Sequence, residues 1–368
     1  MEVLKCIGCG AVLQPEDAKQ IGYVPEIKEK ENLICQRCYR LKYYNQLLPV
    51  TKTKDEFLKI LDQMSQRDAL FVKLVDIFDF QGSWLSGTPR FLKGKDVILI
   101  CNKLDLLPKS LKLMKIEQWV RNQCKEYGLK PKDVLLISAQ KKQGIQEAVE
   151  EILRQRNGRD VVILGATNVG KSTFVNQMLR ELSDSSKDWI TTSHFPGTTL
   201  DVIEIPLDQD HSIFDTPGIV NEHQYTHYVG EKTLRLLTPR KEIKPIVNQL
   251  NAKQTLFYGG LVRIDFIQGE RNSFISFLPA TIKIHRTKLE KADVLFQTHW
   301  GKLLQPPTEE EIKNLPSFQK HYFVIKEDDT DLVISGLGFV NVKHKGAKIV
   351  VYAPKGVGIY IRRSILRK

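Results

Sequence analysis

The sequence predicts an α/β domain with a mostly parallel sheet, preceded by a small cysteine-rich domain and followed by a β-rich domain. Three observations support this: strands alternate with helices between about residues 69 and 215, two C-x2-C pairs stand near the start, and glycine-punctuated strand patterns follow Pro239. A chain of 368 residues is too long for one ordinary core. We therefore expect three domains, at 1–48, 49–238 and 239–368.

The composition excludes several classes of protein. Hydrophobic residues make up 42% of the chain and charged residues 27%, close to globular averages, which argues against a disordered protein. The longest apolar runs are strand-sized, and the first residues lack the basic and apolar regions of a secretory signal. We expect a cytoplasmic protein with no membrane partner.

The N-terminal cysteines predict a zinc site. Cys6 and Cys9 form one pair, Cys35 and Cys38 another, with 25 residues between the pairs. Thiolates two residues apart can converge on one tetrahedral zinc ion, and a helix over 38–45 would complete a treble-clef-like finger. A redox pair or unligated thiols is the alternative. The second pair is surrounded by cations and aromatics suited to phosphate contact and base stacking, or to an ordinary surface: Arg37, Tyr39, Arg40, Lys42, Tyr43 and Tyr44.

The α/β region supplies the strands that position the predicted motifs. In such folds ligands bind at the carboxyl ends of the strands. We expect strands at 69–77, 96–101, 133–137, 160–165, 202–206 and 212–215, and helices at 111–127, 143–156 and 171–182.

Residues 165–172 match the phosphate-binding loop G-x4-G-K-[ST], between a predicted strand and a predicted helix. In this loop glycines let backbone N–H groups surround the phosphates, Lys171 reaches the β- and γ-phosphates, and Ser172 ligates Mg²⁺. The nucleotide-binding residues predicted here are Gly165, Thr167, Asn168, Val169, Gly170, Lys171, Ser172 and Thr173.

A second motif, Asp215-Thr216-Pro217-Gly218, lies 44 residues after Lys171 at the end of an apolar strand. We expect Asp215 to hold Mg²⁺ through water and the Gly218 N–H to sense the γ-phosphate. Between the two motifs, Pro196-Gly197-Thr198-Thr199 suits a switch loop, and Thr199 is the predicted second hydroxyl ligand of Mg²⁺.

The third motif, Asn102-Lys103-Leu104-Asp105, predicts the base. A carboxylate at Asp105 accepts hydrogen bonds from guanine N1–H and its amino group, a donor pair that adenine lacks. Asn102 and Lys103 would brace the loop, and Lys103 can also cover the ring. Ser138-Ala139, 33 residues after Asp105, would offer main-chain N–H groups to the guanine carbonyl.

The order of these motifs indicates a circular permutation. Most GTPases place the phosphate loop first, but here the base motifs precede Gly165. One connection is cut and another closed while strands and loops are kept, with 144–159 as the new link.

The C-terminal region predicts a separate β-rich domain. Strand patterns lie at 253–268, 272–278, 281–287, 293–297, 321–326, 331–341 and 348–363, with helical turns near 308–315. The net charge is +12, and residues 341–368 carry eight basic side chains and no acid. Such a segment suggests a polyanionic partner, or a solvated basic face.

Together these features resemble the YqeH family of circularly permuted GTPases involved in assembly of the small ribosomal subunit. The resemblance rests on the four-cysteine finger, the run Val75-Asp76-Ile77-Phe78-Asp79-Phe80-Gln81-Gly82-Ser83-Trp84, the permuted motif order and the basic C-terminal domain. It implies GTP hydrolysis in the cytoplasm coupled to maturation of the 30S subunit, with the pre-ribosome and rRNA as partners and an RNA-binding C-terminal domain.

Hydrolysis needs an explanation because Ile219 follows Gly218, where many GTPases place a water-orienting glutamine. His223 or Gln224 could act instead. The resemblance implies that Asn168 helps coordinate K⁺. We expect Lys171 and Thr199, assigned above from their motifs, to complete the catalytic set. We expect slow turnover, faster in K⁺ than in Na⁺.

The expected cofactors are therefore GTP or GDP, Mg²⁺, Zn²⁺ and K⁺. Two alternatives to a ribosome-coupled GTPase stay open: a nucleotide-gated RNA-binding scaffold with incidental hydrolysis, and a GTPase that acts on another RNA.

Overall fold

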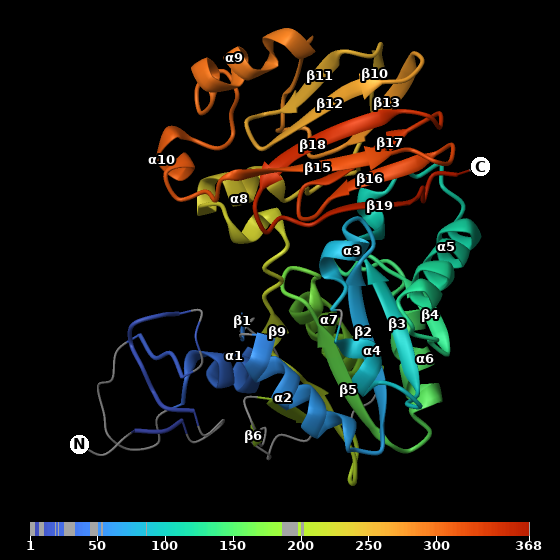
Figure 1. The fold of residues 1–368 in the computed structure, drawn as a ribbon. Coiled ribbons are helices and arrows are strands. Elements are labelled where there is room, and N and C mark those ends of the chain that lie inside the picture. Colours follow the sequence, from blue (N-terminus) through green and yellow to red (C-terminus); the bar gives the residue numbers. More distant parts are fainter. Residues whose placement is uncertain are drawn as a thin grey trace. The chain divides into compact units, whose positions relative to one another are not determined.

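The computed structural model describes residues 4–6, 11–18, 20, 22–25, 34–44, 51–52, 54–85, 87–185, 198–199 and 202–367. The chain forms two compact units (Figure 1). The first comprises Met1–Ile77, Ser83–Leu104 and Glu117–Asn221, and the second Phe78–Gly82, Asp105–Ile116 and Glu222–Lys368. The predicted boundaries of three domains stay predictions. Among the described residues, every helix is too short or too polar to span a bilayer.

The first unit is built on a seven-stranded sheet in the order β4-β3-β2-β5-β8-β7-β6. All neighbouring pairs from β4 to β8 are parallel, and β7 and β6 pair antiparallel at one edge. The strands are β2 (Ala69–Asp76), β3 (Val97–Asn102), β4 (Asp133–Leu136), β5 (Asp160–Gly165), β6 (Thr198–Thr199), β7 (Val202–Pro206) and β8 (Ser212–Asp215). This confirms the predicted mostly parallel sheet.

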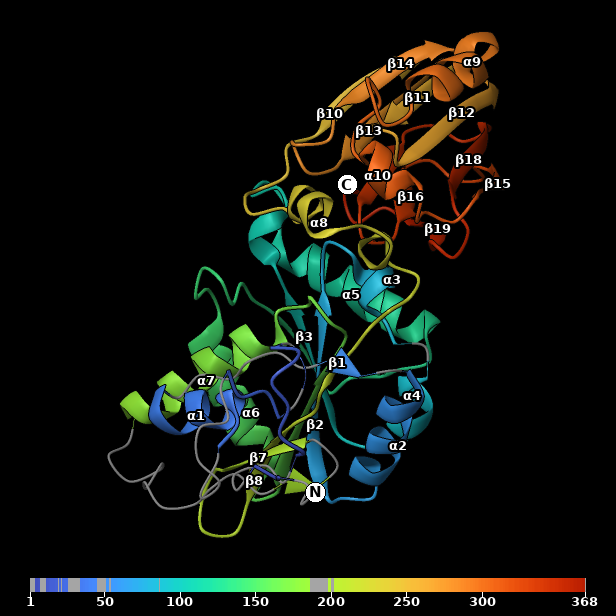
Figure 2. The same ribbon diagram turned by 90° about the vertical axis from the view of Figure 1, so that its left-hand side faces the viewer.

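Strands β2 and β3 are buried along their whole length, because helices cover both faces of the sheet. In Figure 2, α6 (Ile145–Arg156) and α7 (Lys171–Ser185) lie on one side of β2, and α2 (Lys54–Ser65) and α4 (Thr88–Phe91) on the other. The predicted helices agree within a few residues, with α5 at Leu113–Glu126. Helix α2 and the short helix α3 (Phe80–Ser83) were not predicted.

The strand order shows the permutation directly. Strand β5 leads into the phosphate loop and lies between β2, which is earlier in the chain, and β8, which is later. Helix α6 links β4 to β5, so the predicted new connection is a helix packed beside α7. The base motifs at the ends of β3 and β4 therefore reach the same edge of the sheet as the phosphate loop.

The second unit contains two five-stranded antiparallel sheets, which confirms the β-rich prediction. Buried side chains of both sheets form one hydrophobic core, including Leu256, Phe274 and Leu332. One sheet comprises β10 (Ile246–Leu250), β13 (Asn272–Phe277), β17 (Gly338–Val342), β16 (Thr330–Ile334) and β19 (Ile359–Arg363). The other comprises β14 (Ile284–Lys288), β11 (Gln254–Tyr258), β12 (Val262–Gln268), β18 (Lys348–Pro354) and β15 (Phe318–Val324).

Several predicted C-terminal strands differ from the structure. The runs 253–268, 331–341 and 348–363 are each two strands joined by a turn. The strand predicted at 293–297 is wrong, because these residues lie within helix α9 (Leu289–His299). Ala292 and Phe296, four residues apart on one helical face, pack against Phe257, so tertiary contact favours the helix. The helical turns predicted at 308–315 contain α10 (Glu309–Ile312), which Thr308 caps.

The remaining elements are short and lie outside the three large sheets. They are α1 (Gln36–Tyr44), β1 (Thr51–Lys52), the 3-10 turns Leu104–Leu106 and Tyr225–His227, β9 (Gly218–Ile219) and α8 (Glu231–Leu237). Strand β1 pairs in parallel with β9, which immediately follows the Asp215 motif.

Residues 78–82, which directly follow β2, belong to the second unit. The Asp79 carboxylate accepts hydrogen bonds from Gln224 Nε2 (2.9 Å) and from the Gly336 N–H (2.8 Å). Gln81 Oε1 accepts from Arg362 Nη1 at 2.6 Å. These contacts explain why polar side chains follow an apolar strand at this point of the chain.

Lys73 is a fully buried lysine in the centre of β2. Its Nζ donates to Thr88 Oγ1 at 3.3 Å and lies 4.6 Å from the centre of the Trp84 ring. Because burial penalises the charged amine, the pKa of Lys73 falls from 10.5 to about 7.

We predict that Lys73→Met raises the free energy of unfolding at pH 7 by a few kcal/mol, because methionine fills the site without a desolvation penalty. Between about pH 7 and 10.5 the unfolded lysine holds a proton that the folded lysine has lost, so wild-type stability rises with pH across this window. Chemical denaturation at several pH values should show the gain shrinking toward pH 10.5. The exposed Lys93→Met is the control, and a gain independent of pH would contradict the prediction.

Candidate nucleotide-binding site

The phosphate loop connects β5 to α7. Two of its residues have positive φ angles, Asn168 at 63° and Gly170 at 86°. A Cβ added at Gly170 would lie 2.3 Å from Asn102 Nδ2, so both the backbone angle and the close approach require glycine. Asparagine is among the few other residues that tolerate this backbone region, which fits Asn168.

Asn102, at the end of β3, joins three loops. Its side chain is 3% exposed. Nδ2 donates to the Val169 carbonyl of the phosphate loop at 2.8 Å, and Oδ1 accepts from the Ala139 N–H at 2.9 Å. One amide group thus fixes the phosphate loop and the Ser138-Ala139 loop to the end of the strand that carries the third motif.

The other residues predicted to bind the base are fixed by local hydrogen bonds and by a 3-10 turn. Lys103 has a φ of 67° and its Nζ donates to Asp76 Oδ2 at 2.6 Å, which braces the loop. Asp105 lies in the 3-10 turn Leu104–Leu106. The N–H groups of Ser138 and Ala139 donate to the Gln143 carbonyl and to Asn102. Either group must therefore exchange its partner to serve a guanine carbonyl.

Asp215, at the end of β8, is 1% exposed and pairs with two cations. Lys171 Nζ lies 2.5 Å from Asp215 Oδ1, and Arg37 Nη2 lies 3.4 Å from Oδ2. Burial lowers the pKa of Lys171, while Asp215 counteracts this effect. The sequence had suggested phosphate contact or ordinary surface for Arg37, but the side chain is buried on α1. No sequence signal indicated this pairing, since 178 residues separate the partners.

The other residues predicted for the phosphate site lie in α7, β9 and β6. Ser172 and Thr173 lie in the first turn of α7, directly after Lys171, and Gly218 lies in β9. The backbone of Thr199 forms β6, but its side chain, like Pro196-Gly197, lies outside the described residues. A buried carboxylate that already accepts cations, with a hydroxyl at Ser172, is an oxygen donor set that suits Mg²⁺.

The position after Gly218 has no polar group. Ile219 is buried, forms a parallel bridge with Ala166, and its carbonyl accepts from the Thr167 N–H at 2.8 Å. The two alternative catalytic residues have partners in the second unit. His223 Nδ1 lies 3.1 Å from the Gly356 carbonyl, and Gln224 donates to Asp79.

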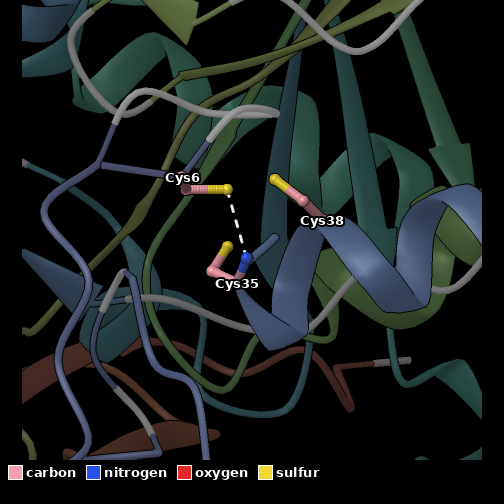
Figure 3. Close-up of side chains that lie close together, drawn as sticks. All are labelled: Cys6, Cys35 and Cys38. Atoms are coloured by element: carbon pink, nitrogen blue, oxygen red, sulfur yellow. Dashed lines mark hydrogen bonds between the residues drawn. The ribbon is translucent and has the colours of Figure 1, made fainter. Parts of the chain in front are cut away.

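The cysteines form a cluster that can hold a metal. The sulfur atoms of Cys6, Cys35 and Cys38 all lie within 4.8 Å of one another and are buried (Figure 3). The Cys35 N–H donates to Cys6 Sγ at 3.2 Å. Tetrahedral zinc thiolates are about 3.8 Å apart, so this arrangement is compatible with zinc. Cys9, the predicted fourth ligand, lies outside the described residues.

The basic C-terminal segment is less available for a polyanion than its composition suggests. Lys343 pairs with Asp329, Arg362 with Asp331, and both Arg363 and Arg367 with Glu327. These acids precede residue 341 in the sequence, so counting charges over 341–368 alone misses them.

Comparison with known proteins decides the family. A family model described as YqeH-like, C-terminal matches residues 271–365, and one described as 50S ribosome-binding GTPase matches residues 160–256. YqeH of Bacillus subtilis (strain 168) is 52% identical over 367 residues, covering 100% of both chains. The chain belongs to the YqeH family.

More distant relatives align over most of the chain. NO-associated protein 1, chloroplastic/mitochondrial, of Arabidopsis thaliana is 30% identical over 98% of this chain and 76% of its own. Nitric oxide-associated protein 1 of Homo sapiens is 23% identical over 99% and 75%. The GTPase model begins at β5 and leaves out the base motifs at β3 and β4, which fits the permuted order.

We predict that Asn102→Ala weakens both folding and GDP binding. The change leaves the Val169 carbonyl and the Ala139 N–H without this partner, at about 1–3 kcal/mol for each buried group. Calorimetric titration with GDP should show affinity reduced at least about tenfold, and denaturation should show the lower stability. Asn122→Ala on the exposed face of α5 is the control, with an expected change within about 0.5 kcal/mol. Unchanged GDP affinity in Asn102→Ala would contradict the bridging role.

Proposed function

We propose that this YqeH-family protein hydrolyses GTP and acts as a cytoplasmic switch in assembly of the small ribosomal subunit. The observation that carries the nucleotide assignment is the Asn102 bridge, because it joins a phosphate loop to the loops expected to read guanine. Asp105 accepts from guanine N1–H and its amino group, and Lys171 with the phosphate-loop N–H groups binds the phosphates.

In the proposed reaction a water oxygen bonds to the γ-phosphorus as the bond to the β-bridging oxygen breaks. GDP leaves with the bond electrons, and the proton of the water passes to the released phosphate. Ser172 and Thr199 would hold Mg²⁺ through their hydroxyl groups and Asp215 through water, and the ion would supply positive charge to the phosphates.

K⁺ assistance is part of the proposal because Ile219 cannot orient water. Asn168 is exposed at the phosphate loop with its backbone in the left-handed region, so its amide oxygen can serve a cation beside the phosphates. Such a cation stabilises charge in the transition state. The intrinsic rate is slow because this charge depends on a weakly held ion.

The proposed RNA contact of the second unit is supported by an exposed patch on β15 and β18. Tyr322 is 73% exposed, and Lys320 lies opposite Tyr352 on the neighbouring strand, with its Nζ 5.5 Å from the ring centre. Lys348, opposite Val324, extends the patch. Aromatic rings between lysines can stack bases while the amines contact phosphates.

The chain connectivity supports a switch. The C-terminal and longest segment of the second unit begins at Glu222, four residues after Gly218. Ordering of the Gly218 N–H by a γ-phosphate can therefore act on the connection to this segment. The rival is a nucleotide-gated RNA scaffold with incidental hydrolysis. A GTPase acting on another RNA shares the same contacts with phosphates.

We predict that purified 30S subunits accelerate GTP turnover in K⁺ more than in Na⁺. Turnover is measured with 30S, 50S or unrelated RNA, and GDP affinity checks nucleotide loading.

Two substitutions test the residues assigned to K⁺ and to guanine. Asn168→Gly keeps the positive φ without strain and removes the side-chain amide, so it should abolish the preference of GTP turnover for K⁺ over Na⁺. Asp105→Asn should lose GTP turnover through lost guanine affinity.

If 50S subunits alone stimulated turnover, the proposed partner would be the large subunit and not the small subunit. The description of the matching GTPase family model names the 50S ribosome. Tight GTP binding with equal, slow turnover in every mixture would favour the scaffold. An unchanged K⁺ preference in Asn168→Gly would contradict the assignment of the cation.

A further inference from the structure

Arg37 is a buried arginine of the cysteine segment that contacts the phosphate-site carboxylate. It lies on α1 between Cys35 and Cys38 and is 7% exposed. Its Nη2 is 3.4 Å from Asp215 Oδ2, and its Nε finds no hydrogen-bond partner among the described residues although it is shielded from solvent. A buried guanidinium with one long contact and an unsatisfied donor is costly unless a further acceptor comes near it.

The position of Asp215 indicates which acceptor this is. The other oxygen of the same carboxylate pairs with Lys171, the residue that serves the β- and γ-phosphates in phosphate loops. Asp215 also ends β8, next to β5 and the phosphate loop in the sheet. Arg37 therefore approaches the terminal-phosphate side of the site, not the side of the base motifs.

The charges of the site point the same way. Lys171 and Arg37 carry two positive charges against the single negative charge of Asp215, and all three side chains are buried. A magnesium–GTP complex carries two net negative charges. Phosphate oxygens can accept hydrogen bonds from the Nη and the Nε groups of Arg37 together. The Asp215 carboxylate, which is shared with Lys171, accepts only from Nη2 and leaves Nε without a partner among the described residues.

We propose that Arg37 donates to the γ-phosphate of bound GTP, so that the cysteine segment supplies an arginine to the nucleotide site of its own chain. On nucleotide binding Asp215 turns from Arg37 and Lys171 to the hydrated magnesium ion, and both cations turn to phosphate oxygens. Arg37 then adds positive charge beside the γ-phosphate, which stabilises the transition state of hydrolysis in a site where Ile219 cannot orient water. The inference rests on the proposed GTPase function.

The competing interpretation is that Arg37 only pairs with Asp215. In that case Arg37 competes with magnesium for the carboxylate, and removing it should strengthen binding of GDP and GTP alike. The two interpretations predict opposite changes in affinity.

The test measures the affinities of GTPγS and GDP, with Mg²⁺, for the full chain and for Arg37→Gln. We expect GTPγS affinity to fall about tenfold and GDP affinity to change less than about twofold, because only GTPγS has the third phosphate. The rate constant of single-turnover GTP hydrolysis should fall by a larger factor than the affinity for GTPγS. Arg37→Lys, which keeps the charge without the fork, should recover part of both losses.

Arg40→Gln, an exposed arginine on the same helix, is the matched control and should behave as wild type in both assays. Zinc content and thermal unfolding of each variant show whether the cysteine segment stays intact. If Arg37→Gln loses zinc, Arg37→Lys decides, since the proposal requires a lowered ratio of GTPγS to GDP affinity with zinc retained.

An unchanged or raised GTPγS affinity in Arg37→Gln with zinc retained would overturn the proposal while leaving the GTPase function intact. A wild-type protein that binds GTPγS but does not hydrolyse GTP would overturn the hydrolytic function, and the affinity ratio would still decide the Arg37 contact. A wild-type protein that binds neither nucleotide would overturn both.

Discussion

The side-chain amide of Asn102 is the interaction on which the candidate site depends. Its two hydrogen bonds, to Val169 and to Ala139, connect loops that follow three different strands of one parallel sheet. Permutation changes the order in which these loops occur in the chain, but it does not change which strand ends meet at the edge of the sheet. Gly170 is required because any side chain there would collide with this amide. The phosphate loop and the predicted base loops therefore stay joined although the phosphate loop follows the base motifs in the chain.

A second constraint is the sharing of Asp215 by two cations from distant parts of the chain. Lys171 belongs to the phosphate loop and Arg37 to the segment that carries the cysteine cluster, so a single buried carboxylate connects the two. Residues 78–82, directly after β2, belong to the second unit, where Asp79 accepts from Gln224 and Gln81 accepts from Arg362.

Much of the fold could be predicted from sequence because parallel strands buried on both faces are continuous apolar runs, as in β2 and β3, and because the motifs stand at their ends. The helix α9 was mistaken for a strand, since a short apolar run does not reveal its period until Phe257 packs against it. Arg37 could not be assigned, because pattern and spacing say nothing of a contact across 178 residues. The positive charge available on the C-terminal segment was overestimated for the same reason, because acidic residues that pair with its basic side chains lie outside the segment.

We propose that separated segments of the chain form one guanine-nucleotide site to which the cysteine segment contributes. Hydrogen–deuterium exchange with and without Mg²⁺ and GTPγS, with ATPγS as the control nucleotide, measures whether these segments respond to the ligand together. We expect GTPγS, and not ATPγS, to slow exchange together in 165–173, 102–105 and 138–139, and also in α1 around Arg37. Protection confined to the phosphate loop, or equal protection by both nucleotides, would contradict it.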